Sequence, residues 1–426
     1  MNSSLVTDLG LGPEIWLFLT LLGCVTLFFK FSRIWSVRNL DLLLLFALAP
    51  GMMLLVGKGE HNSWVAYLGL FIGSGLWLIR CGADLGLARR PLLEPNLNAS
   101  GLLCLSLGIL GLLLAETVSL PVEDGAARNP AEPTGREDRS APGPGENSAT
   151  AKQLIKIAPL PSALKQQRPL VIVSRVLASL AHLGLVLGLL GIGWRHFDRP
   201  LTGMAMVACY LLLPYTRMAL VDSAQLIPSA LIVAAVFWHL RPALAGALIG
   251  LAGGWMPACL GLIALWCGFF RGRGAIKFVT VALAVVICCA LFGRFGPALV
   301  GDWARGLGAR SIAEVGLLPH FQPRSEGSFW VSIDSSFRLP VLIAYLALVI
   351  LFSIWPADKN LAELISLSAL LLVASQFWYL EKGGTLVMLY LPLAIAMMFR
   401  PTLSIRRPLS PAHQRRAVRP SLYPSS

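Results

Sequence analysis

Long apolar runs, separated by short polar or charged stretches, recur along most of the chain. Several of these runs reach the roughly 20 apolar residues that an α-helix needs to cross a bilayer. The runs are continuously apolar rather than alternating, which favours helices over the strands of a membrane barrel. The pattern predicts spans at about residues 15–30, 40–57, 63–79, 100–120, 170–193, 202–216, 223–238, 242–254, 256–270, 278–299, 339–355, 360–379 and 384–399.

The region from 211 to 277 is the part of the chain that points to a specific molecular role. Arg217 and Asp222 separate two of its apolar runs, and a polar turn at 239–241 leads into a longer run. That longer run breaks at the sequence Gly-Gly-Trp-Met-Pro, residues 253–257. Residues 242–270 are therefore either two short spans joined by a turn or one interrupted segment.

The positive charges decide between these alternatives. Lys and Arg follow the first, third, fifth, seventh and ninth predicted spans, and six Arg residues close the chain from Arg400 to Arg419. All of these charges fall on one side of the membrane only if 242–270 crosses it twice. Cytoplasmic loops are enriched in Lys and Arg, so this side is predicted to be cytoplasmic. We therefore expect an all-α, polytopic transmembrane bundle of about 13 spans, with the N-terminus outside and the C-terminus inside.

The spans differ enough in character to suggest a domain organisation. The first spans have short loops, and we expect residues 1–95 to form an accessory transmembrane bundle. Residues 96–400 would then be the core, with two long outer segments at 122–169 and 301–338. A basic cytoplasmic tail follows at 401–426.

Composition agrees with a membrane protein. The chain is 56% hydrophobic and only 13% charged, which excludes an ordinary soluble protein. Its formal net charge of +13 sits mainly in short loops and the tail, so nucleic-acid binding is not expected. None of the eight cysteines belongs to a CxxC pair, and neither a disulfide framework nor a metal site is indicated. The N-terminus has no basic region before its first apolar run, which predicts a retained span rather than a signal peptide.

The first long outer segment has two halves. Its first half is rich in Pro, Gly, Ala and charge and has too few apolar residues to form a core. Its second half mixes Lys152, Lys156, Lys165 and Arg168 with Leu, Ile and Pro, which is typical of a basic segment lying on a membrane surface. The second outer segment carries aromatic and charged residues that would either cap a cavity or anchor Trp side chains at the interface.

Few ionisable residues lie near membrane depth. Arg217 and Asp222 sit at an outer edge, where such groups pair or line a polar path. Both a structural ion pair holding two helix ends and a direct functional role fit this pattern. Glu116, Glu123 and Asp124 follow the fourth span, where a carboxylate could act as a general base, bind a metal or simply be solvated.

Two further features have structural explanations. His182 lies alone in an apolar span and is interpreted as a satisfied core histidine. Gly246 and Gly250 are four residues apart on one predicted helix face, which predicts close helix packing. The break at 253–257 is best explained by a turn between two spans.

Residues 170–277 resemble the membrane-embedded C-type glycosyltransferases, which use polyprenyl-phosphate sugars as donors. The stretches that carry the resemblance are SRVLASLAHLGLVLGLLGIGWRHFDRPLTG, LLPYTRMALVDSAQLIPSALIVAAVFW, RPALAGALIGLAGGWMP and CLGLIALWCGFFRGRG. Together they cover about a quarter of the chain. The resemblance implies a C-type glycosyltransferase-like core in a bacterial inner membrane.

The resemblance also implies a site. The family's catalytic acid lies in the first outer loop of the core, which makes Asp124 or Glu123 the expected general base. Arg175, Arg217, Asp222 and the basic residues Lys156, Lys165 and Arg168 would bind the lipid-phosphate sugar donor. Some relatives use a divalent metal ion, so a metal cofactor stays open.

Two positions differ from the family pattern. Trp255 occupies the helix break where a Lys is common, and the acidic loop lacks the usual aromatic and proline context. An alternative is therefore a catalytically inactive membrane protein of the same fold that acts in envelope assembly. A transporter is a further alternative, although few charged residues lie within spans and no inverted repeat is evident.

Overall fold

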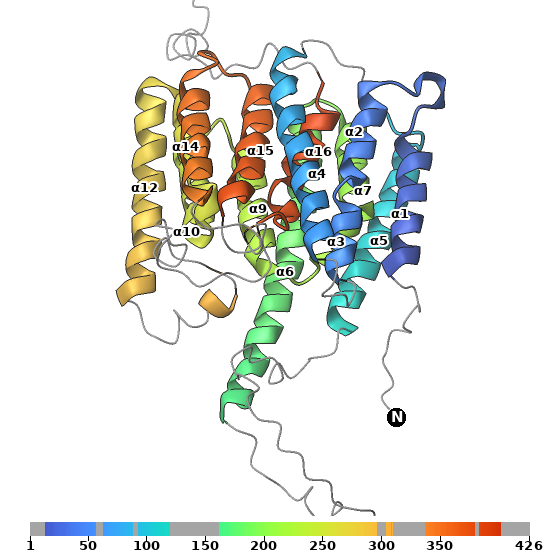
Figure 1. The fold of residues 1–426 in the computed structure, drawn as a ribbon, viewed down its shortest axis with the longest axis horizontal. Coiled ribbons are helices and arrows are strands. Elements are labelled where there is room, and N and C mark those ends of the chain that lie inside the picture. The colour runs from blue at the N-terminus through green and yellow to red at the C-terminus, as the bar shows by residue number, and fades with distance from the viewer. Residues whose placement is uncertain are drawn as a thin grey trace, which may run out of the picture.

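The structure is a computed structural model that describes residues 13–56, 63–87, 93–119, 162–295, 304–307, 309, 330, 337–379 and 383–401. Nearly all of these residues are helical, and no strand occurs among them. The helices stand side by side along one common direction (Figure 1). The prediction of an all-α bundle is confirmed.

The helices follow one another along the chain with short connections. The N-terminal helices are α1 (Pro13–Phe28), α2 (Val37–Phe46), α3 (Ala49–Val56), α4 (Ser63–Ala83) and α5 (Ala99–Ser119). The middle helices are α6 (Ser162–Arg195), α7 (Pro200–Leu212), α8 (Pro214–Met218), α9 (Ser223–Phe237), α10 (Pro242–Trp255), α11 (Gly261–Phe270) and α12 (Gly272–Phe295). The last three are α14 (Arg338–Ile354), α15 (Leu361–Trp378) and α16 (Val387–Phe399).

Within the described residues, six helical segments are long and apolar enough to cross a membrane. They are Val37–Leu55, Trp64–Gly86, Ala99–Val118, Leu170–Arg195, Gly272–Gly293 and Leu361–Trp378. Seven shorter helices are also apolar. These features are compatible with an integral membrane protein.

The two ends of the bundle are distinguished by the chain segments that meet there. At one end Phe28 packs edge-on against Phe399, with ring centroids 5.4 Å apart, so α1 and α16 both end there. We call this the tail end, because α16 leads into the C-terminal tail. Helix α5 begins at the tail end, since Asn96 donates its backbone N–H to Leu27. The opposite end, where α5 finishes and α6 begins, is the loop end.

Helix α6 is much longer than its neighbours. Its 34 residues correspond to about 51 Å, whereas the hydrocarbon core of a bilayer is about 30 Å thick. Its first turns extend past the rest of the bundle at the loop end (Figure 1). The apolar part, Leu170–Arg195, is long enough to span a membrane by itself.

The Gly-Gly-Trp-Met-Pro break is a reversal of the chain. Gly246 of α10 lies against the backbone of Phe278 in α12, and Gly250 lies against Ala282 four residues further along both helices. Helices α10 and α12 therefore run in the same direction, and α11 between them must run the opposite way. Met256 is extended and a short 3₁₀ turn, η4 (Pro257–Cys259), completes the reversal. The predicted turn and the predicted close packing of these glycines are both confirmed.

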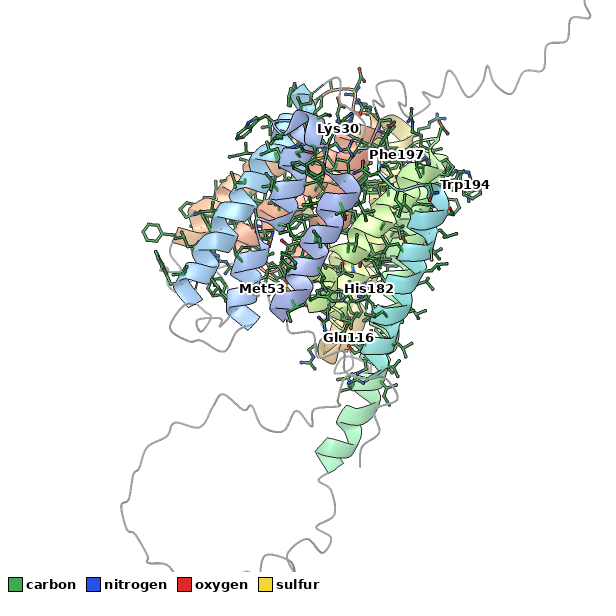
Figure 2. All side chains as sticks on the ribbon, turned by 90° about the vertical axis from the view of Figure 1, so that its right-hand side faces the viewer. Lys30, Met53, Glu116, His182, Trp194 and Phe197 are labelled. Atoms are coloured by element: carbon green, nitrogen blue, oxygen red, sulfur yellow. The ribbon has the colours of Figure 1, made fainter. Side chains whose placement is uncertain are left out.

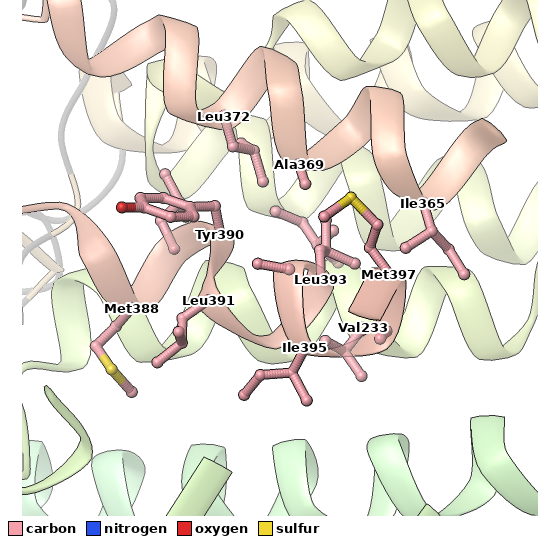
Figure 3. Packing of buried hydrophobic residues seen from close by; sticks show 14 of the residues in the cluster. Val233, Ile365, Ala369, Leu372, Met388, Tyr390, Leu391, Leu393, Ile395 and Met397 are labelled. Carbon is pink, nitrogen blue, oxygen red and sulfur yellow. The ribbon is translucent and has the colours of Figure 1, made fainter. Parts of the chain in front are cut away.

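The core lies around the two C-terminal helices. Every residue of α16 is buried, and 89% of α15 is buried. Figure 3 shows side chains of α16 such as Leu393 and Met397 packed against Ile365 and Ala369 of α15. By contrast, only 17% of the apolar segment of α12 and 22% of that of α5 are buried. An apolar helix that exposes most of its surface is suited to lipid contact.

The N-terminal helices contact this core directly. Phe71 of α4 packs edge-on against Phe377 of α15, with centroids 5.1 Å apart. Trp77, one of the largest fully buried residues, packs against Tyr390 of α16. The domain boundary near residue 95 stays a prediction.

A buried ionic network joins these parts at the tail end. Arg80 of α4 contacts Asp41 through Nε at 2.5 Å and Asp84 through Nη1 at 3.1 Å. Arg400, just after α16, places its Nη2 2.6 Å from Asp84, which also accepts a hydrogen bond from Ser366 of α15. Burial, and then the charge of Arg80, lowers the pKa of Arg400 to about 10, so its guanidinium stays charged at neutral pH.

Candidate functional site at the loop end

The predicted site residues divide into two groups. Glu123, Asp124 and Lys156 lie outside the described residues. Lys165 and Arg168 belong to the first turns of α6, but their side chains are outside the described part. The structure therefore places three side chains of the predicted site, those of Arg175, Arg217 and Asp222, and all three lie at the loop end.

The local sequence explains why Arg217 lies at a helix end. Helix α7 stops at Leu212, because Pro214 follows and forces Leu213 into an extended conformation. Pro214 then starts the short helix α8, a position where its missing N–H has no cost. The hydroxyl of Thr216 donates to the carbonyl of Tyr210 and closes this turn. Arg217 thus sits in a short, fixed connection between α7 and α9.

Arg217 forms an ion pair with Glu116, in the last turn of α5. Its Nε lies 2.8 Å from Oε1 and 3.1 Å from Oε2 of Glu116, and both side chains are 27% exposed. The guanidinium also lies over the ring of Trp16 in α1, 4.6 Å from its centroid. Among the described residues no hydrogen bond engages the two Nη groups of Arg217.

Asp222 has a different partner. It precedes α9, and its Oδ2 accepts a hydrogen bond from Nε2 of Gln225 at 2.9 Å. Gln225 is buried, and its Oε1 accepts the backbone N–H of Met388 near the start of α16 at 3.2 Å. Arg217 therefore does pair structurally with a carboxylate, but the carboxylate is Glu116 rather than Asp222.

Arg175 lies in the same region, because its neighbour Ser174 contacts Ser223. The hydroxyl of Ser223, next to Asp222, donates to the carbonyl of Leu307 at 2.7 Å. A hydroxyl has only one hydrogen, so the 3.3 Å contact between Ser174 and Ser223 has Ser174 as donor. Arg175 follows Ser174 on α6 and is half-buried. Residues 174–175 of α6, the start of α9 and the turn at Leu307 therefore lie close together here.

Part of the second outer segment covers the loop end. Trp330 is buried and donates its indole N–H to the carbonyl of Phe377, near the end of α15, at 3.1 Å. Arg338 donates through Nε to the carbonyl of Trp378 at 2.8 Å. Trp330 therefore docks on the last turn of α15 instead of anchoring in lipid. The other Trp of the second outer segment, Trp303, lies outside the described residues.

His182 lies deeper in the bundle and is satisfied. Its Nδ1 lies 2.8 Å from the hydroxyl of Tyr210, and its Nε2 lies 3.3 Å from the carbonyl of Leu220. A carbonyl only accepts, so Nε2 carries the proton and Nδ1 accepts from Tyr210. The interpretation of His182 as a core histidine is confirmed.

The described residues contain no group of three or more His, Cys, Asp or Glu that could hold a metal ion. The metal cofactor left open by the resemblance stays a prediction.

The sequence did not single out Glu116 over the two loop acids, and the roles of Gln225 and Trp16 were not predicted. The signal for Glu116 was a carboxylate within the last turn of an apolar span, where an unpaired charge is costly. Nothing in the sequence marked Trp16 or Gln225, because both act through residues remote from them in the chain.

No known family, curated protein or solved structure matches this chain. The site is therefore interpreted from its own chemistry.

Proposed function

We propose that this protein is a membrane-embedded transferase that moves a sugar from a polyprenyl-phosphate donor to an acceptor at the loop end. The observation that carries the proposal is the way in which the side chain of Arg217 is held. Glu116 holds its Nε and Trp16 covers one face, while both Nη groups stay without a hydrogen bond in the described part of the chain. A guanidinium presented in this way can donate two parallel hydrogen bonds to a phosphate.

The membrane topology in this proposal has thirteen passes. The six long apolar segments and the seven shorter apolar helices supply that number if each crosses once. The reversal between α10 and α11 supports counting these two short helices separately. We further propose a bacterial inner membrane with the tail end in the cytoplasm, because exposed arginines such as Arg195, Arg199, Arg241 and Arg271 gather at that end.

The proposed chemistry is a single displacement. Asp124 or Glu123 takes the proton of the acceptor hydroxyl as its oxygen attacks the anomeric carbon. The bond from that carbon to the phosphate oxygen breaks, and the electron pair leaves with the polyprenyl phosphate. Arg217 holds this leaving group, with Arg175 and the basic residues Lys156, Lys165 and Arg168 as further cationic partners. One displacement without a covalent intermediate inverts the anomeric configuration.

Several features of the loop end support this assignment. Helix α5 ends four residues before Glu123, and α6 carries Arg175 at the same end of the bundle. Asp222 accepts a hydrogen bond from Gln225, and the carboxylate that pairs with Arg217 is that of Glu116. Polar side chains at the edge of apolar helices are where a lipid-linked phosphate would be met.

The test uses purified protein in nanodiscs and a set of short-chain polyprenyl-phosphate hexoses and pentoses, radiolabelled in the sugar. We expect one donor to bind and to lose its label to an acceptor from an envelope extract. Arg217→Ala should weaken donor binding at least about tenfold, since a charge-assisted bidentate contact is lost. The matched control is Arg271→Ala, which removes an exposed ion-paired arginine at the opposite end.

Binding without turnover would support the alternative of an inactive protein of the same fold. Trp255 favours that alternative, because it occupies the helix break where a Lys is common in the family that residues 170–277 resemble. Failure of every polyprenyl-phosphate donor to bind would overturn both versions.

A further inference from the structure

An arrangement at the tail end, remote from the proposed site, has the chemistry of a second binding site. Arg195 ends α6, Trp238 follows α9, and Arg241 immediately precedes α10. The guanidinium of Arg241 lies 4.9 Å from the centroid of the Trp238 ring, and that of Arg195 lies 5.8 Å from the same ring. Two guanidinium groups thus share one indole.

Two histidines hold this arrangement in place. The Nε2 of His196 lies 2.8 Å from the carbonyl of Phe237, and the Nδ1 of His239 lies 2.9 Å from the carbonyl of Val236. The two imidazole rings are buried and their centroids lie 4.6 Å apart. The turn after α6 is therefore packed on the turn after α9, which brings both arginines to the Trp238 ring.

The surroundings of the arginines are apolar and exposed. Trp194 is 69% exposed and Leu240 is 57% exposed, and Leu201 and Leu244 also face outward. Figure 2 shows Trp194 projecting from the bundle near Phe197 at this end. Exposed Leu and Trp beside Arg are typical of the level at which acyl chains give way to lipid headgroups.

Around Trp238, the three arginines Arg195, Arg199 and Arg241 outnumber the two acidic residues Glu94 and Asp198. Arg199 lies 3.9 Å from Glu94, and Asp198 is the other acidic residue of the turn. Arg241 contacts no carboxylate among the described residues; its partner is the indole of Trp238. A guanidinium held by an indole face keeps all of its N–H donors available in the plane.

We propose that Arg195, Trp238 and Arg241 form a binding site for the phosphate of an anionic phospholipid in the leaflet that meets the tail end. The planar N–H groups of two arginines match phosphodiester oxygens, and the neighbouring Trp194 and Leu240 would contact the glycerol and upper acyl chains. An anionic headgroup is selected over a zwitterionic one, because the two guanidiniums repel the headgroup's own ammonium. This inference does not depend on the proposed transferase activity.

The test is native mass spectrometry of protein released from nanodiscs that contain equal amounts of phosphatidylglycerol and phosphatidylcholine. We expect retention of phosphatidylglycerol by the native chain. In the double variant Arg195→Ala/Arg241→Ala, retention should fall at least about tenfold, while phosphatidylcholine is unaffected. The matched control is Arg271→Ala/Arg273→Ala, which removes two exposed arginines at the same end that share no indole. That control should change retention by less than about twofold.

Three further outcomes bear on the proposal. A fall of equal size in both double variants would overturn it, because retention would then follow total charge. Displacement of the lipid by millimolar inorganic phosphate would also overturn it, since the site would then be a general anion site. If the double variant does not fold, the charge-conserving variant Arg195→Lys/Arg241→Lys tests the proposal in its place. It loses the planar fork and should retain less phosphatidylglycerol, and unchanged retention would contradict the proposal.

Discussion

The Nε of Arg217 lies 2.8 Å from Oε1 of Glu116, across a sequence separation of 101 residues. This pair connects the end of α5 to the short helix α8 at the loop end of the bundle. It orients Arg217, whose two Nη groups are without a hydrogen bond in the described residues. The pair therefore has both a structural and a positioning role, and these roles can be separated by experiment.

Exchanging the two charges should separate them. The variant Glu116→Arg/Arg217→Glu keeps an ion pair, so its thermal unfolding should stay within about 1 kcal/mol of the native chain, as expected for a partly exposed pair. Its carboxylate at position 217 repels phosphate, so binding of a polyprenyl-phosphate donor should be lost. Unfolding is measured in detergent by intrinsic fluorescence, and binding with a radiolabelled donor. Donor binding that survives the exchange would show that Arg217 does not contact the phosphate.

Removing the carboxylate of Asp84 should destabilise the fold far more than exchanging the charges of Glu116 and Arg217. This carboxylate is 2% exposed and contacts both Arg80 and Arg400. Asp84→Ala leaves buried guanidinium charge uncompensated, which typically costs about 3–5 kcal/mol. Thermal unfolding in detergent measures the loss.

The control for this prediction is Asp358→Ala, which removes the acid of an exposed pair with Arg271. Surface pairs contribute about 0–1 kcal/mol, so this variant should unfold almost as the native chain does. Equal destabilisation of the two variants would contradict the view that the tail-end network holds α4, α15 and the end of α16 together.

A methyl group at Gly250 should separate α10 from α12. A Cβ at this position would lie 2.6 Å from the carbonyl oxygen of Ala282, well inside van der Waals contact. Gly250→Ala is therefore expected to destabilise by roughly 1–3 kcal/mol, as overpacking usually does. Gly108→Ala in α5 provides the same substitution where a Cβ meets nothing within 4 Å, and it should be neutral or stabilising because alanine favours helix. Destabilisation at Gly108 with tolerance at Gly250 would contradict the close packing.

The proposed orientation predicts opposite labelling at the two ends. Trp35 is 99% exposed near the tail end, and Val118 is 81% exposed at the end of α5. Trp35→Cys should react with a charged, membrane-impermeant maleimide only after cells are opened, whereas Val118→Cys should react in intact cells. The unmodified chain serves as the control for its own cysteines. Labelling of Trp35→Cys in intact cells would contradict the proposed orientation, because the tail end would then face outward.

Much of the fold could be predicted because it depends on local pattern. Continuous apolar runs predicted helices, and charge placement predicted that 242–270 contains a reversal, which the parallel packing of α10 and α12 confirms. The isolation of His182 in an apolar span was enough to predict a satisfied core histidine. In each case the deciding information lies within one or two turns of helix or in the charge of the adjoining loops.

The site could be predicted only in part, because side-chain partners depend on which helices are neighbours. Arg217 was identified as a costly charge at membrane depth that needs a partner. Its actual partner, Glu116, could not be selected over Asp222 without knowing that the end of α5 lies beside α8. The shared contacts of Gln225 with Asp222 and Met388 likewise require α9 and α16 to meet.

The sequence by itself determined that this chain is an apolar helical bundle with basic residues gathered at one end, since these properties follow from hydrophobicity and charge along the chain. Only the tertiary structure decided that α16 is the buried centre, that Arg217 faces Glu116 and Trp16, and that Arg195 and Arg241 share Trp238. The physical reason is that apolar helices look alike in sequence whether they face lipid or protein. Which face is buried, and which polar groups then meet, is settled by packing between helices distant in the chain.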